Sequence, residues 1–167
     1  METDEHGWKT VCGDKHPFNR SVLMKALARM FGGKGKKRTK EFPDPVLGTL
    51  RLTDENWWEA TVAIDGRTLG FKIGGDVEPD AALVEHAHDI VRSFAEFDRM
   101  VAEFLTSEAR RMPGAADEIR QLVIAEVSLC WPKRPDDGLI YFKGPDKYRL
   151  WRCDYVGRKP QGLGFDD

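Results

Sequence analysis

Between residues 46 and 73 apolar and polar side chains alternate, which is the period of half-buried β-strands. The alternation around Leu50 indicates a first strand. A second strand carries Trp58, Ala60, Val62 and Ile64 on one face. Asp65-Gly66 then precedes a third strand, and Asp-Gly supplies the positive φ angles of a two-residue hairpin. The pattern predicts a three-stranded antiparallel meander.

From residue 80 onward the spacing becomes helical, because apolar residues recur at alternating steps of four and three. They form one stripe: Leu83, Ala87, Ile90, Phe94, Phe97, Val101 and Phe104. The stripe predicts one long helix, from about Asp80 to Glu108, whose apolar side packs on the sheet. After the break at Pro113-Gly114, a shorter helix is predicted from Ala115 to about Leu122.

Three further strands are predicted near the C-terminus: about 123–131, 139–143 and 148–155. Turns that contain glycine and aspartate separate them. The predicted fold class is therefore α+β, an antiparallel sheet in the order three strands, two helices, three strands, with the long helix packed on the sheet. We expect one domain over residues 42–167.

Residues 1–41 have a different character and are predicted to form an N-terminal extension. A short amphipathic helix is expected at 20–31, followed by a basic linker. The extension contains ten Lys/Arg and five Asp/Glu, whereas residues 42–167 contain sixteen and twenty-three, so +5 stands against −7. The linker could contact nucleic-acid phosphates through Lys34, Lys36, Lys37, Arg38 and Lys40. The acidic domain would repel the same polyanion, so nucleic-acid binding is a secondary hypothesis.

The compartment is inferred from missing signals. No apolar run approaches the ~20 residues that cross a bilayer, and the start of the chain lacks the features of a secretory signal. The three cysteines, Cys12, Cys130 and Cys153, are odd in number and far apart, which favours reduced thiols. We expect a cytoplasmic protein without a membrane span.

The candidate catalytic and metal-binding residues are few. His86 and His88 lie on the predicted long helix, where residues two apart diverge by about 200°, so we expect solvated surface histidines and no metal site. Cys130 and Cys153 are expected to be inert thiols in strands. Asp136-Asp137 precedes a glycine and is interpreted as a turn. No cofactor is predicted.

Aromatic residues give the clearest hint of binding. Adjacent Trp57 and Trp58 must face opposite sides of a strand, which places Trp57 outward beside Glu59. Trp151 alternates with Leu150 in the same way. An outward tryptophan is either covered by another element, such as the N-terminal helix, or is a hot spot for a partner. The predicted partner-binding residues are Trp57, Glu59 and Trp151.

Several short motifs occur in a fixed order: Asp44-Pro45-Val46-Leu47-Gly48, then Trp57-Trp58-Glu59, then the Asp65-Gly66 hairpin before the long helix. With the two C-terminal strands, they resemble a family of small bacterial domains of unknown function over about residues 44–155. The resemblance implies no activity and no site.

Small bacterial domains of this type also occur among immunity proteins, which neutralise toxins. The leading hypothesis is therefore a non-enzymatic, immunity-type interaction module whose acidic body covers a basic toxin or nuclease surface. The alternative is a small enzyme with a cleft between sheet and long helix, built from dispersed Asp, Glu and His.

Overall fold

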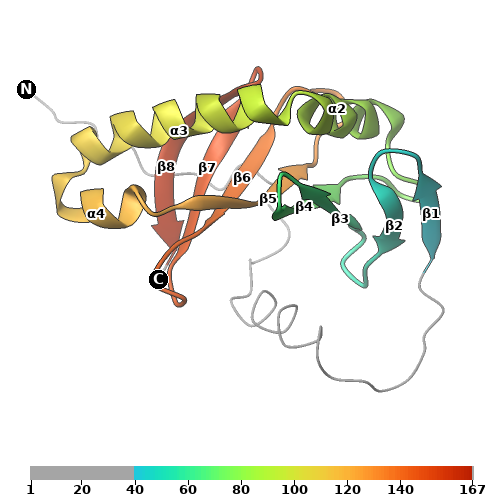
Figure 1. The fold of residues 1–167 in the computed structure, drawn as a ribbon. Helices are drawn as coiled ribbons and strands as arrows, with labels where there is room; N and C mark the ends of the chain where they lie inside the picture. The colour runs from blue at the N-terminus through green and yellow to red at the C-terminus, as the bar shows by residue number, and fades with distance from the viewer. Residues whose placement is uncertain (1–39, 167) are drawn as a thin grey trace, which may run out of the picture. The chain divides into compact units, whose positions relative to one another are not determined.

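The computed structural model of the chain describes residues 40–166. Within this range the chain forms one sheet of eight strands, and the strands follow one another across the sheet in sequence order (Figure 1). They are β1 (Glu41–Asp44), β2 (Gly48–Leu52), β3 (Trp58–Ile64), β4 (Arg67–Ile73), β5 (Val123–Leu129), β6 (Gly138–Lys143), β7 (Leu150–Val156) and β8 (Lys159–Asp166). The predicted helix at 20–31 and most of the basic linker lie outside the described residues.

Neighbouring strands are antiparallel except for β4 and β5, which run parallel. Parallel neighbours need a long crossover connection. The helical segment provides it, with α2 (Ala81–Arg92), α3 (Phe94–Arg111), the 3₁₀ turn η1 (Pro113–Ala115) and α4 (Ala116–Ile119). The fold is thus two four-stranded antiparallel meanders joined through helices. The predicted α+β class is confirmed, whereas the predicted three-strand groups on either side of the helices are wrong.

The two strands missing from the prediction are the edges of the described sheet, β1 and β8. β1 contains Pro43, and proline is tolerated at an edge because the outward N–H is not needed there. β8 is interrupted by Gly162, whose φ of 57° accompanies a shift in the β7–β8 register. This irregularity lets the Leu163 side chain point into the core. Buried and exposed residues therefore do not alternate regularly along β8.

The predicted single helix from Asp80 to Glu108 is two helices, separated at Ser93. Asp80 does begin the first one, because its carboxylate accepts from the N–H groups of Ala82 and Leu83. At Ser93 the hydroxyl donates to the Asp89 carbonyl over 2.6 Å, and the backbone leaves helical geometry with ψ of 32°. A serine bonded to the carbonyl four residues earlier commonly bends a helix.

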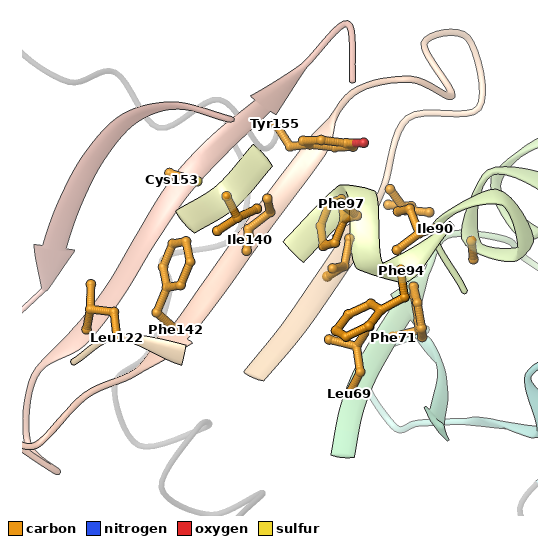
Figure 2. Close-up of a cluster of buried hydrophobic side chains, with 14 of the residues drawn as sticks. Leu69, Phe71, Ile90, Phe94, Phe97, Leu122, Ile140, Phe142, Cys153 and Tyr155 are labelled. Carbon is orange, nitrogen blue, oxygen red and sulfur yellow. The ribbon is translucent and has the colours of Figure 1, made fainter. Parts of the chain in front are cut away.

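The core lies between these helices and one face of the sheet, as the stripe predicts. Phe94, Phe97 and Val101 are buried on α3. Figure 2 shows that Phe94 and Phe97 face apolar side chains of the strands. The strand residues in this cluster include Leu69, Phe71, Ile140, Phe142, Cys153 and Tyr155. Apolar side chains therefore fill the space between these helices and this face of the sheet. Among the described helices, none has the length and hydropathy needed to span a membrane.

Candidate functional site

None of the described helices covers the second face of the sheet (Figure 1). The strand positions that point to this face carry mostly polar side chains. Cross-strand pairing aligns them: Glu59 of β3 is opposite Lys72 of β4, and Lys72 is opposite Ser128 of β5. We name this surface the outer face and define it by Arg51, Glu59, Lys72, Glu126, Tyr141 and Arg152, together with Glu41 and Asp166, which pair with the two arginines. These residues alternate with buried ones along each strand, so they point away from the helices.

Two glutamates share one lysine at the centre of the outer face. Lys72 Nζ lies 3.4 Å from Glu126 Oε1 and 3.8 Å from Glu59 Oε1. The Lys72 side chain is only 18% exposed, whereas that of Glu59 is 43% exposed. Burial is the main cause that raises the pKa of the Glu59 carboxyl, and the nearby carboxylates of Glu126 and Glu55 raise it further. The ammonium of Lys72 lowers this pKa, but the net shift is upward. With two carboxylates around one ammonium, this cluster carries a net negative charge.

Trp57 does not belong to a strand but ends the turn before β3. Its N–H donates to Thr53 Oγ1 over 3.2 Å, and its carbonyl accepts the Thr53 N–H over 2.8 Å. The residue is half-buried, so part of its surface is accessible next to the start of β3. Of the predicted partner-binding residues, Trp57 and Glu59 thus keep exposed surface.

Trp151 is different, and the expectation that it points outward is wrong. Its side chain is 0% exposed, because Trp151, Cys153 and Tyr155 form the face of β7 that meets the helices. The indole N–H donates to Glu118 Oε1 over 2.6 Å. Leu150 is the half-buried neighbour. Trp151 is part of the core and supplies no surface for a partner.

The two histidines diverge on α2 as predicted, but the expectation of solvated side chains is wrong. His86 is 3% exposed and His88 is 7% exposed. His88 Nε2 lies 2.9 Å and 3.0 Å from the two carboxylate oxygens of Asp44, which also accepts the N–H groups of Val46 and Leu47. This contact joins α2 to the turn between β1 and β2.

Asp44 is held as an anion by these donors. Burial by itself raises the pKa of its carboxyl, but the N–H groups of Leu47 and Val46 and the imidazole of His88 together lower it below the ordinary value. The Asp44–His88 pair is therefore a structural tie. The turn it closes includes the glycine with φ of 79° at position 48, which is the left-handed conformation that glycine adopts without strain.

His86 sits in a separate cluster at the opposite side of α2. Its ring stacks on Tyr155 with a centroid distance of 5.7 Å, and neither ring nitrogen has a hydrogen-bond partner. Asp136 Oδ1 is 3.8 Å from His86 Nδ1, and Arg158 binds Asp136. Burial lowers the pKa of His86, and the Arg158 charge lowers it further, against Asp136 and Asp89.

The remaining candidates have structural roles. Cys153 is buried, and burial followed by the Asp154 charge raises the pKa of its thiol. Asp136 lies in a turn before β6, as predicted, and the Asp137 carboxylate accepts the Gly157 N–H over 2.9 Å. Within residues 40–166 no group of three or more His, Cys, Asp or Glu is arranged to hold a metal ion.

The basic linker is described only at Lys40. Its ammonium donates to the Val77 carbonyl and lies 5.8 Å from the centre of the Trp58 ring. The other predicted phosphate-binding residues, Lys34, Lys36, Lys37 and Arg38, lie outside the described residues. Lys40 is thus engaged beside the start of β1, and nucleic-acid binding by the linker stays a prediction.

Sequence reasoning missed the two charged neighbours of Glu59 on the outer face, Lys72 and Glu126. Each stands at a polar position of a strand, which is a signal visible in the sequence. Their approach to Glu59 depends on the parallel pairing of β4 with β5 across the helical crossover, and strand alternation does not reveal that pairing.

No protein-family model matches the chain, and no curated protein or solved structure matches it either. The resemblance to a family of small bacterial domains stays a prediction.

Proposed function

We propose that the chain is a non-enzymatic interaction module that binds a basic protein partner at the outer face. The domain predicted at 42–167 carries a net charge of −7. A domain with this balance attracts basic surfaces and accelerates their association. The immunity-type role expected from the sequence agrees with such a partner, a basic toxin or nuclease.

The arrangement of Glu59, Glu126 and Lys72 is the observation that carries the proposal. A single, mostly buried ammonium lies between two carboxylates, and Glu59 keeps 43% of its side chain exposed. The carboxyl pKa of Glu59 is raised by burial and by neighbouring acids, so its charge is incompletely balanced. A lysine or arginine of a partner would supply the missing charge through a short, charge-assisted hydrogen bond.

The packing of the helices favours this proposal over the enzyme alternative. The alternative requires a cleft between the sheet and the helices. Phe94, Phe97 and Leu105 are buried in that space with the apolar face of the strands. The histidines it would use are buried as well, with His88 bonded to Asp44. Neither observation provides a place for a substrate.

Affinity capture from a lysate of the source organism tests the proposal. The bait is the full chain, alongside a Glu59→Lys variant and a matched Glu103→Lys variant. Glu103 is 67% exposed on α3, on the helical side of the sheet. We expect a basic protein in stoichiometric amount on the wild-type and Glu103→Lys baits, and its loss on Glu59→Lys, because reversing the charge replaces attraction with repulsion. Capture by all three baits, or by none, contradicts the proposal.

A further inference from the structure

Arg158 fastens together three segments that are far apart in the sequence. Its Nε lies 2.5 Å from Asp136 Oδ1 in the loop before β6, and its Nη1 lies 3.1 Å from Asp89 Oδ2 on α2. Arg158 itself is in the β7–β8 turn, at a φ of 65°. We name the set of Arg158, Asp89 and Asp136 the Arg158 latch.

Two backbone hydrogen bonds cross the same junction. The Arg158 N–H donates to the Asp136 carbonyl over 3.0 Å, and the Gly157 N–H donates to Asp137 Oδ1 over 2.9 Å. The tip of the β7–β8 hairpin is thus attached to the loop by main-chain groups as well as by the guanidinium. These two amides report directly on whether the junction is closed.

Beneath the latch lies His86, a buried imidazole with two unused polar atoms. It is 3% exposed, and neither Nδ1 nor Nε2 has a hydrogen-bond partner. A buried polar group without a partner is unfavourable, and proteins satisfy the great majority of such groups. Asp136 Oδ1 is 3.8 Å from Nδ1, about an ångström beyond the usual hydrogen-bond distance.

We propose that His86 is an acid-sensitive trigger of the Arg158 latch: its protonation draws Asp136 away from Arg158 and opens the junction between the 131–137 loop and the β7–β8 turn. A neutral imidazole leaves Asp136 free to bind Arg158. An imidazolium competes for the same carboxylate and at the same time repels the guanidinium. The proposal concerns control of this end of the molecule and is independent of partner binding at the outer face.

The surroundings of His86 determine the direction of the effect. The positive charge of Arg158, in the β7–β8 turn, opposes protonation of His86. The carboxylates of Asp136, in the loop, and Asp89, on α2, favour protonation of His86. Tyr155 of β7 stacks on the imidazole ring. Burial raises the pKa of Tyr155 to about 12, so the phenol stays neutral while His86 titrates. In the closed latch burial and Arg158 prevail, and the pKa of His86 is lowered.

The open junction binds the proton more tightly, because there His86 is hydrated and has lost the nearby guanidinium. By linkage, acid therefore shifts the population from closed to open. The shift begins near the ordinary histidine pKa of about 6.5 and reaches at most about tenfold for each further pH unit. It ends once the closed form is protonated too.

Amide hydrogen exchange on the full chain tests the latch, with NMR protection factors of Gly157 and Arg158 corrected for the intrinsic pH dependence. Between about pH 7.5 and pH 5 we expect both factors to fall by more than about threefold, while amides of β3 and β4 hold theirs. In His86→Phe, which keeps an aromatic ring for Tyr155, the fall disappears. A smaller change in the wild type, or an equal fall in the variant, overturns the proposal.

A second measurement serves if His86→Phe does not fold. The ring resonances of His86 in the wild-type chain give its pKa directly. A value below about 6.5 that coincides with the midpoint of the Gly157 and Arg158 changes supports the latch. A pKa at or above that value overturns it, because the closed junction would then be stabilised by acid.

Discussion

The indole N–H of Trp151 donates to Oε1 of Glu118 over 2.6 Å, and this bond connects β7 to α4. The second oxygen, Oε2, accepts from Arg149 over 2.6 Å. One carboxylate therefore satisfies a fully buried indole and holds the strand that follows the β6–β7 turn. Trp151, one of the two tryptophans predicted from the sequence to bind a partner, is instead buried in the core.

Replacing Glu118 by alanine should lower the free energy of unfolding by about 1–3 kcal/mol, because the buried indole N–H of Trp151 loses its acceptor. Urea denaturation measures the change. Asp117→Ala is the matched control: its side chain is 97% exposed, and we expect little change. Equal losses in the two variants would show that the Trp151 contact contributes nothing specific.

The aromatic centre of the core should respond to truncation. Phe97 is 4% exposed and contacts both Phe94 and Tyr155. Phe97→Ala should cost about 3–5 kcal/mol of unfolding free energy, since it leaves a cavity beneath α3. Tyr148→Ala, at a position 68% exposed, should change the melting temperature little. A mild Phe97→Ala phenotype would contradict the packing of α3 on the sheet.

Acid should weaken the tie between Asp44 and His88. The pKa of Asp44 is lower in the folded state than the ordinary value of about 3.9. Its contribution to stability is therefore complete above that value and is lost as pH falls through the folded-state pKa. We expect Asp44→Asn to reduce stability at neutral pH and to flatten the loss of stability below about pH 4. A parallel, undiminished acid loss in the variant would exclude Asp44 as its source.

The cysteine thiols should differ in reactivity. Cys153 is 1% exposed, and burial together with the Asp154 charge raises its thiol pKa, so little thiolate forms at neutral pH. Cys130 is partly exposed. In the native chain, peptide mapping after iodoacetamide treatment should find Cys130 modified at least about tenfold faster. Comparable rates would show that β7 opens readily.

Local sequence patterns predicted the strands in which apolar and polar residues alternate. They also predicted the apolar stripe of the helices that pack on the sheet. Trp58, Ala60 and Phe71 face the core as their spacing requires. β1 and β8 were not predicted, because Pro43 and Gly162 interrupt the alternation of apolar and polar residues. Both strands are defined by their pairing with a neighbouring strand. The break between α2 and α3 at Ser93 was not predicted, because the apolar stripe continues across it. The hydrogen bond from the Ser93 hydroxyl to the Asp89 carbonyl accounts for the break.

The candidate site was predictable only in part, since its contacts join distant residues. Glu59 could be placed on the polar side of its strand, but its neighbours Lys72 and Glu126 depend on sheet register. The burial of His88 depends on Asp44, forty-four positions earlier. For Trp151 the alternation left two faces possible, because Leu150 and Trp151 are both apolar. In the structure Trp151 faces the core, where the carboxylate of Glu118 on α4 accepts its indole N–H.

The central claim, recognition of a basic partner by the outer face, is tested most directly by a dissociation constant. Isothermal titration of the captured partner should be carried out at low and at physiological salt against the wild type, Glu59→Lys and Glu103→Lys. We predict at least about tenfold weaker binding for Glu59→Lys, most evident at low salt, and little change for Glu103→Lys. Dissociation constants that agree within about twofold for all three proteins would contradict the account.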